Sequence, residues 1–354
     1  MHDSKLDPPP VHVHLVNPLW DPAGGSDWRT IDTWRLLRDH AEVSLWSEFR
    51  PASVFHHQYR IRAIRPLVMR FPRGGTLVFV GTYFRIGHWT RLASFRRVVI
   101  LYNTNQPDRL AKNVTRLTRA GHRPEVIYTS EALRRLHGGA GHVLQSPIDI
   151  ERFHAAPMNP ASVNSAPRPF TVGRLSRDIR SKHHADAAVL WKSLADAGLR
   201  IRLMGASCLA AELDGHPGIE ILPARSEDPA EFLRSLDCFV YRTSDDWFEG
   251  YGRVVMEAMA TGLPVVVGDR GGYVEHLRDG INGLVARSTT EMIAAVRSLA
   301  ADRALAARLG SAARRDAVEF NTEVLPRRTV ALLTTGIAPA LPAGEDANVA
   351  TAIG

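Results

Sequence analysis

The stretch that decides the fold is DDWFEGYGRVVMEAMATGLPVVVGDRGGYVE, residues 245–275. Its PVVVGD run predicts a buried strand, and Gly252 opens a helical pattern just before that run. Glu249 lies in a glycine-rich loop, and Glu257 lies eight residues later inside the helix. A helix N-terminus offers free N–H groups and partial positive charge, which suit a phosphate. Either carboxylate alone would be an ordinary surface charge, but together they predict a nucleotide site, with Glu257 on the ribose and Glu249 beyond the phosphates.

Strand-like runs alternate with helical patterns on both sides of this stretch. The strands are expected at 11–16, 42–46, 76–81, 97–102, 125–129, 141–144, 170–174, 200–204, 219–222, 238–242 and 264–269. This alternation is typical of the α/β class, in which helices cover both faces of a parallel sheet. We expect two doubly wound, Rossmann-like domains facing a cleft, with ligands beyond the carboxyl ends of the strands.

Composition also marks the expected domain boundaries. Residues 157–169 are rich in Pro, Ser, Asn and Ala without periodicity, which predicts a linker. The N-terminal domain is then expected at 11–156 and the C-terminal domain at 170–318, followed by a crossover helix at 319–335 that packs back on the N-terminal domain. Residues 1–10 and 336–354 are expected to be disordered.

The chain has 354 residues, of which 45% are hydrophobic and 23% charged, which excludes a disordered or fibrous protein. No apolar stretch approaches the roughly 20 residues of a membrane span, and the start MHDSKLDPPP lacks the pattern of a signal peptide. The two cysteines, Cys208 and Cys238, are too few for a disulfide framework, which favours a reducing compartment. We expect a soluble, cytoplasmic protein.

The formal net charge of +7 is unevenly distributed. Residues 1–150 carry 21 basic against 12 acidic side chains, whereas residues 151–354 carry 23 against 25. Between Arg50 and Arg123 there are 14 Arg and Lys112, with Asp108 as the lone carboxylate. This excess predicts an anionic partner for the N-terminal half: nucleic acid, anionic lipid or a phosphorylated acceptor. The alternative is a codon bias toward arginine.

Two hypotheses address this basic stretch. In the first, it recruits the protein to an anionic membrane leaflet, with interleaved apolar side chains inserting shallowly. The arginines concerned are Arg60, Arg62, Arg65, Arg70, Arg73, Arg96 and Arg97, and the apolar residues are Phe55, Tyr59, Ile64, Leu67, Val68 and Phe71. In the second, it binds nucleic acid, but no recognition module or stacking-aromatic pattern accompanies the charge.

The motifs resemble those of retaining nucleotide-sugar glycosyltransferases with the GT-B architecture, glycosyltransferase family 4 (glycosyl transferases group 1). The resemblance rests on Glu249-x7-Glu257, on EAMATGLPVVV (257–267) and on GDRGGYVEHLRDGINGLV (268–285). VGRL (172–175) with Lys182, the Gly24-Gly25 pair and SPIDIERF (146–153) extend it over roughly 11–330. It implies a nucleotide diphosphate sugar as donor substrate, an acceptor-binding N-terminal domain, and a reaction without metal or other cofactor.

The resemblance also implies site residues. Arg174 and Lys182 would pair with the donor diphosphate and offset its charge as it leaves, and Glu249 would contact hydroxyls of the donor sugar. The donor-binding set implied in full is Gly24, Gly25, Arg174, Lys182, Leu222, Glu249, Gly250, Tyr251, Gly252, Arg253, Val254 and Glu257. Because Lys182 follows Arg174 at a longer spacing than is usual in the family, Arg177 and Arg180 are alternatives to it.

The acceptor side departs from the family pattern. Many members have a His near the reacting centre, where this sequence has Asn103. An amide hydrogen-bonds a hydroxyl but does not titrate near neutrality, so a protein base at this position is not expected. His88, at another strand exit, is the second acceptor-side candidate. No His, Cys, Asp and Glu spacing suits a metal ion.

The sequence therefore predicts a retaining, metal-independent glycosyltransferase. It would move a hexose from a nucleotide diphosphate sugar to a glycan or lipid-linked acceptor in bacterial surface-polysaccharide assembly, in the cytoplasm or at the inner face of the membrane. The alternatives are a sugar phosphorylase or sugar-phosphate transferase on the same scaffold, and a catalytically degenerate scaffold subunit.

Overall fold

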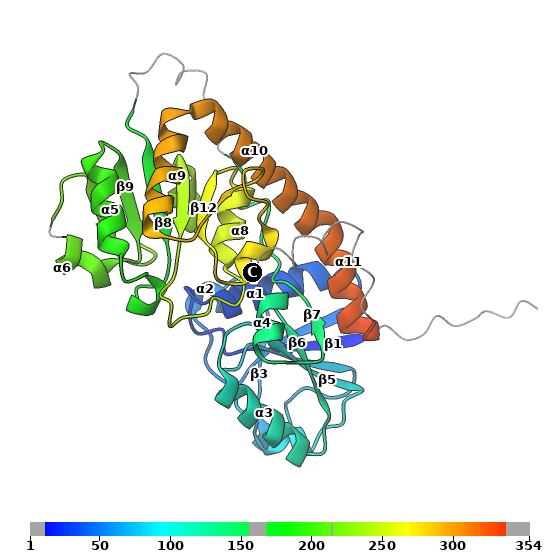
Figure 1. Ribbon diagram of the computed structural model, residues 1–354. Coiled ribbons are helices and arrows are strands. Elements are labelled where there is room, and N and C mark those ends of the chain that lie inside the picture. Colours follow the sequence, from blue (N-terminus) through cyan, green and yellow to red (C-terminus); the bar gives the residue numbers. More distant parts are fainter. Residues whose placement is uncertain (1–10, 156–167, 214, 338–354) are drawn as a thin grey trace, which may run out of the picture. The chain divides into compact units, whose positions relative to one another are not determined.

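The computed structural model describes residues 11–155, 168–213 and 215–337, which form two compact units (Figure 1). The first unit runs to Thr129, includes His137–Pro147 and resumes at Leu325. The second contains Ser130–Leu136 and Ile148–Val324. Residues 1–10, most of the predicted linker and all but the first two residues of the predicted disordered tail lie outside the described residues.

The first unit is built on a seven-stranded sheet in the order β3-β2-β1-β4-β5-β6-β7, with every neighbouring pair parallel. The strands are β1 (His12–Val16), β2 (Glu42–Ser47), β3 (Ile61–Ala63), β4 (Thr76–Val80), β5 (Arg97–Tyr102), β6 (Pro124–Tyr128) and β7 (His142–Val143). The strand order reverses between β1 and β4, so the carboxyl ends of these two strands form the switch point of the sheet.

Helices of the first unit come from both ends of the sequence. They are α1 (Gly25–Leu37), α2 (Ser53–His56), α3 (Pro107–Arg119) and α11 (Leu325–Val330), with 3-10 turns η1 (Pro66–Val68) and η2 (His88–Arg91) and a final π-helical turn η8 (Ala331–Thr335). The C-terminal segment is anchored here: α11 packs against α1, and Arg328 Nη2 donates to the carbonyl of Val143 at 2.9 Å. The last helical segment thus completes the first unit.

The second unit has a six-stranded parallel sheet in the order β10-β9-β8-β11-β12-β13. Its strands are β8 (Thr171–Leu175), β9 (Arg200–Met204), β10 (Ile219–Leu222), β11 (Cys238–Tyr241), β12 (Val265–Gly268) and β13 (Leu284–Ala286). Alternate side chains such as Val172, Ile201 and Val240 enter one core with α5 and α9. The switch point lies between β8 and β11.

The helices of the second unit are α4 (Glu131–Leu136), α5 (Ala187–Asp196), α6 (Ala210–Leu213), α7 (Pro229–Arg234), α8 (Arg253–Ala260), α9 (Thr289–Ala301) and α10 (Arg303–Glu319). Short turns are η4 (Arg180–Lys182), η5 (Ser207–Leu209), η6 (Gly272–His276) and η7 (Phe320–Val324). The Leu- and Ala-rich pattern near 289–319 is two helices, because the Asp302 carboxylate accepts from Leu305 N at 2.9 Å and starts α10.

Two parallel, Rossmann-like sheets confirm the predicted α/β fold class. All eleven predicted strands are present, whereas the sequence missed β3 and β13. Both are only three residues long. Among the described residues, no helix combines the length and apolar character of a membrane span.

Candidate active site

The candidate site lies at the switch point of the second sheet, where β8 and β11 are neighbours. Arg174 is on β8, Tyr241 ends β11, and the loop after β11 carries Glu249 to the start of α8. Parallel strands of this topology bind ligands beyond their carboxyl ends, at the point where the strand order reverses. The topology therefore gathers these residues where a ligand is expected.

Arg174 is almost completely buried, and several contacts fix the orientation of its guanidinium. Its guanidinium lies over the ring of Tyr241, 4.3 Å from the ring centre, while Nη1 donates to the carbonyl of Arg242 at 2.9 Å and Nη2 donates to the carbonyl of Lys182. Burial lowers the pKa of Arg174 from its ordinary value. The cation is thus fixed at the carboxyl end of β8, with part of its charge turned to backbone carbonyls.

Lys182 and Glu249 form a buried ion pair, although they are 67 residues apart in sequence. Lys182 Nζ donates to Glu249 Oε2, and the hydroxyl of Tyr241 donates to the same oxygen at 2.8 Å. Nζ also lies 4.9 Å from the ring centre of Trp247. Burial acts to raise the pKa of Glu249, but the Lys182 ammonium and the two hydrogen bonds outweigh it and lower that pKa. The carboxylate is therefore ionised and faces a cation.

The turn into α8 requires glycine. Gly252 has φ 71° and ψ 54°, and a Cβ there would lie 2.8 Å from Cδ1 of Tyr273. Gly252, the N-cap residue of α8, has no side chain with which to cap the helix. Arg253 and Val254 begin this helix, so their amides stand at its positive end. The helix start predicted from the sequence is confirmed.

A second glycine pair supports the loop that carries Glu249. Gly271 has φ 130°, and the amide of Gly272 donates to the carbonyl of Glu249 at 2.8 Å. A Cβ on Gly272 would collide with the carbonyl oxygen of Gly250 and lie 2.6 Å from Cβ of Ser130. The GG motif at 271–272 thus lets three segments of the second unit pack without side chains between them.

The remaining residues predicted for the donor site lie around this centre. Glu257 is 8% exposed on α8, with Oε1 3.4 Å from Nη2 of Arg253 one turn earlier. Tyr251 is buried against the ring of His276, with 5.3 Å between ring centres. Leu222 ends β10, and its carbonyl accepts from Gly205 N at 2.8 Å. All the predicted donor residues of the C-terminal half therefore belong to the second unit.

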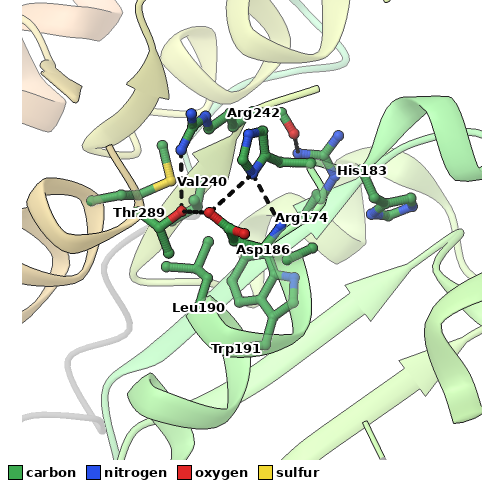
Figure 2. Close-up of a pocket in the computed structure, with 11 residues that line it drawn as sticks. Arg174, His183, Asp186, Leu190, Trp191, Val240, Arg242 and Thr289 are labelled. Carbon is green, nitrogen blue, oxygen red and sulfur yellow. Dashed lines mark hydrogen bonds and ion pairs between the residues drawn. The ribbon is translucent and has the colours of Figure 1, made fainter. Parts of the chain in front are cut away.

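A pocket that Arg174 also lines was not predicted from the sequence (Figure 2). Its lining comprises Arg174, His183, His184, Asp186, Ala187, Leu190, Trp191, Val240, Arg242, Thr289 and Met292. The Oγ1 of Thr289 joins its two sides, since it accepts from Arg242 Nη1 at 3.1 Å and donates to Asp186 Oδ2 at 3.0 Å. Burial lowers the pKa of His183 to about 4. The pocket therefore has polar groups in its lining, namely this neutral imidazole and the Arg242–Thr289–Asp186 bridge, beside the Arg174 side chain.

The glycines predicted to approach the donor lie in the first unit. Gly24 is the N-cap of α1 and Gly25 is its first residue. A Cβ on Gly24 would lie 2.5 Å from Oδ2 of Asp27 and 2.9 Å from the carbonyl oxygen of Asp21. Asp27 is buried, which raises its pKa to about 7. The packing of the turn therefore explains why residue 24 is a glycine, without reference to a ligand.

The two acceptor-side candidates occupy different places in the first unit. Asn103 follows β5, and a Cβ on Gly81 (φ 81°) would lie 3.4 Å from its Oδ1 and 2.5 Å from Oγ of Ser26. Asn103 thus stands at the switch point between β1 and β4. His88 begins η2 and is exposed.

The sequence missed a half-buried carboxylate near η2. Glu48, which follows β2, accepts from Arg85 N at 2.5 Å and from Nε1 of Trp89 at 3.2 Å. Burial raises its pKa to about 7. Its position directly after a predicted strand was the only available signal. Within the described parts of the chain, no three or more His, Cys, Asp or Glu side chains are grouped so that they could hold a metal ion.

Residues 161–316 match the family model described as glycosyl transferases group 1. This region contains Arg174, Lys182, Glu249 and Glu257. The chain is also similar in fold to the crystal structure of Anabaena Alr3699/HepE in complex with UDP and glucose, with a TM-score of 0.70, 18% identity, and coverage of 92% of this chain and 100% of that one. The solved structures with this fold include glycosyltransferases.

Curated proteins also match parts of the chain. The D-inositol 3-phosphate glycosyltransferase of Nocardia farcinica is 35% identical over 120 residues, which are 32% of this chain and 25% of that protein. The N,N'-diacetylbacillosaminyl-diphospho-undecaprenol alpha-1,3-N-acetylgalactosaminyltransferase of Campylobacter jejuni is 30% identical over 128 residues, 36% of this chain and 33% of that protein. The matches thus span a quarter to a third of these relatives.

Proposed function

We propose that the protein is a retaining, metal-independent glycosyltransferase that moves a hexose from a nucleotide diphosphate sugar to a hydroxyl of a glycan or lipid-linked acceptor. The observation that carries the proposal is the cluster at the second switch point, in which Arg174, Lys182 and Glu249 meet and the loop that carries Glu249 leads into the N-terminus of α8. Two fixed cations and a helix N-terminus are the groups that a diphosphate requires.

In this proposal, Arg174, Lys182 and the first amides of α8 hold the diphosphate, and Glu257 accepts from ribose hydroxyls. The oxygen of the acceptor hydroxyl bonds to the anomeric carbon as the bond between that carbon and the diphosphate oxygen breaks. The electron pair goes to the leaving nucleoside diphosphate, where the cations stabilise the added charge. The leaving phosphate oxygen takes the acceptor proton, so the step needs neither a titrating residue at Asn103 nor a metal ion.

Glu249 would accept hydrogen bonds from hydroxyls of the donor sugar. Its carboxylate is already ionised and oriented by Lys182 and Tyr241. A bound diphosphate offers Lys182 a second anion, so the ammonium would link the sugar-binding carboxylate to the leaving group. This arrangement couples sugar recognition to the charge that develops in the transfer.

Two comparisons support the choice of substrates. The neighbouring Anabaena structure contains UDP and glucose, and the Campylobacter relative is named for a diphospho-undecaprenol acceptor. On these grounds we propose a sugar nucleotide as donor, and as acceptor a lipid-linked glycan of bacterial surface-polysaccharide assembly.

The test is a transfer assay with radiolabelled UDP-, GDP-, ADP- and TDP-hexoses, each offered with lipid-linked saccharides and, separately, with inorganic phosphate. We expect transfer to a saccharide from one nucleotide, with the anomeric configuration of the donor retained in the product by proton NMR. Inversion would refute the retaining mechanism. Transfer to phosphate alone would identify a phosphorylase, and nucleotide binding without any transfer would identify a degenerate scaffold.

A further inference from the structure

A short loop of the first unit presents apolar side chains to solvent. It begins after β3 and ends before β4, and the backbones of Arg65 and Arg70 close it through two hydrogen bonds of 2.7 and 3.1 Å. The tip is the turn η1 together with Met69, which has φ 55°. Because the backbone bonds close its base and Met69 turns the chain, the loop has a defined conformation.

The tip is the most exposed apolar surface among the described residues. Leu67 is 100% exposed, Val68 68% and Met69 55%. Single exposed apolar side chains are common, but three consecutive ones at the end of a projecting loop are not. Burial of such side chains in an apolar phase would be strongly favourable.

The base of this loop is fixed to the core. Before the tip, Ile64 N donates to the carbonyl of Ser47 at 2.8 Å. After it, Phe71 is 4% exposed, and the carbonyl of Arg73 hydrogen-bonds Nε2 of buried His14 at 3.0 Å. The tip is therefore held on a base that is hydrogen-bonded to, and packed into, the core of the first unit.

The surroundings of the tip are basic. No Asp or Glu occurs between Glu48 and Asp108. The exposed arginines of the loop and the adjoining segment are Arg60, Arg65, Arg70, Arg73, Arg91 and Arg96. The adjoining segment is tied to the loop base, since Ser94 accepts from Gly74 N at 2.9 Å and Arg96 N donates to Gly75 at 2.8 Å.

The structure corrects the sequence-based membrane hypothesis in its details. Phe55 and Phe71 are buried in the core and are not available for insertion. Arg97 is paired with Glu125, with Nη2 2.6 Å from Oε2. Of the six apolar residues named from the sequence, Leu67 and Val68 are exposed large hydrophobic residues, and Met69 joins them.

We propose that residues 65–70 are a membrane-docking loop, which inserts Leu67, Val68 and Met69 into an anionic lipid surface while the flanking arginines contact the headgroups. Charge complementarity selects this occupant, since a lipid surface offers both an apolar layer for the tip and phosphates for the ring of cations. A nucleic acid offers the phosphates but no apolar layer. The docking does not rest on glycosyl transfer, and it is measurable without any sugar donor.

The experiment is co-sedimentation of the protein with vesicles of phosphatidylglycerol and phosphatidylcholine at several salt concentrations. We expect binding that rises with the phosphatidylglycerol fraction and falls with salt. The triple variant Leu67→Ser, Val68→Ser, Met69→Ser should bind at least about tenfold more weakly. Arg70→Gln should lower binding about fivefold. The matched controls are Val189→Ser, at a 61% exposed residue on α5, and Arg315→Gln, at an exposed residue on α10.

A second measurement reports the tip itself. An environment-sensitive fluorophore on Leu67→Cys, in a Cys208→Ser background that leaves only buried Cys238, should shift to the blue on anionic vesicles. The same label on Val189→Cys should not. Absence of vesicle binding, equal loss in the controls, or an unshifted label at position 67 would overturn the proposal. So would a labelled single-stranded RNA that binds equally well to the triple variant while vesicles do not bind at all.

Discussion

Replacement of Lys182 by Met tests the buried pair at the centre of the site. The change leaves the Glu249 carboxylate 15% exposed, with the Tyr241 hydroxyl as a remaining donor. Removal of one partner of a buried pair typically costs about 3–5 kcal/mol, because the other charge stays buried and uncompensated. We expect the free energy of unfolding of the second unit to fall by this amount in Lys182→Met, and by a similar amount in Glu249→Gln.

The double variant Lys182→Met, Glu249→Gln separates the charge effect from lost packing. It leaves no uncompensated charge, so its loss should be well below the sum of the single losses, with a coupling of at least about 2 kcal/mol. Asp245 and Arg270 supply the matched control, because their side chains, 3.3 Å apart, are 61% and 59% exposed. An exposed pair of this kind should couple by less than about 1 kcal/mol.

Hydrogen exchange of β8 and β11 peptides in increasing urea measures the stability of the second unit by itself. Additive losses in the Lys182 and Glu249 variants would refute the reasoning, because they would show that the two charges do not compensate one another. A control coupling as large as that of the buried pair would refute it as well.

Three further predictions concern pH and backbone geometry. The pKa of Glu249 is lowered in the folded protein, so ionisation of this carboxylate stabilises the fold above its ordinary pKa of 4.5, and this stabilisation is lost as pH falls through the pKa of the folded state. Urea melts of Glu249→Gln should lack this acid-induced loss. Burial raises the pKa of Glu275 to about 7, so the wild type should lose up to about 3 kcal/mol as pH rises from 4.5 through 7, and melts of Glu275→Gln should show a flatter profile. Gly272→Ala should weaken nucleotide binding at least about tenfold in titration calorimetry, because its Cβ collides with the carbonyl oxygen of Gly250 and displaces the loop that carries Glu249. Gly280→Ala, whose Cβ meets nothing within 4 Å at φ 73°, should cost about 1 kcal/mol of stability and leave binding unchanged.

The sequence predicted the two sheets well because the strand runs are short, β-branched and separated by helical patterns. It also pointed to the start of α8, since Gly252 is required by a left-handed backbone that few other residues adopt. These are local signals, read within a few neighbouring residues.

The contacts of the site were not local. No spacing in the sequence shows that Lys182 reaches Glu249 across 67 residues, or that both meet the hydroxyl of Tyr241. The sheet order produces these contacts, because it places β8 beside β11. Exposure was equally hidden: Phe71 and Leu67 have similar hydropathy and lie four residues apart, yet the first anchors a loop and the second projects from it.

The most direct test of the central claim, a donor site at the second switch point, is titration calorimetry with a panel of UDP-, GDP-, ADP-, CMP- and TDP-sugars. Wild type is compared with Glu257→Ala, which removes the carboxylate proposed to hold the ribose, and with Val189→Ser as a surface control. We predict binding of sugars of one nucleotide, weakened at least about tenfold by Glu257→Ala and unchanged in the control. Binding of equal strength in wild type and Glu257→Ala, or no binding of any nucleotide, would contradict the account.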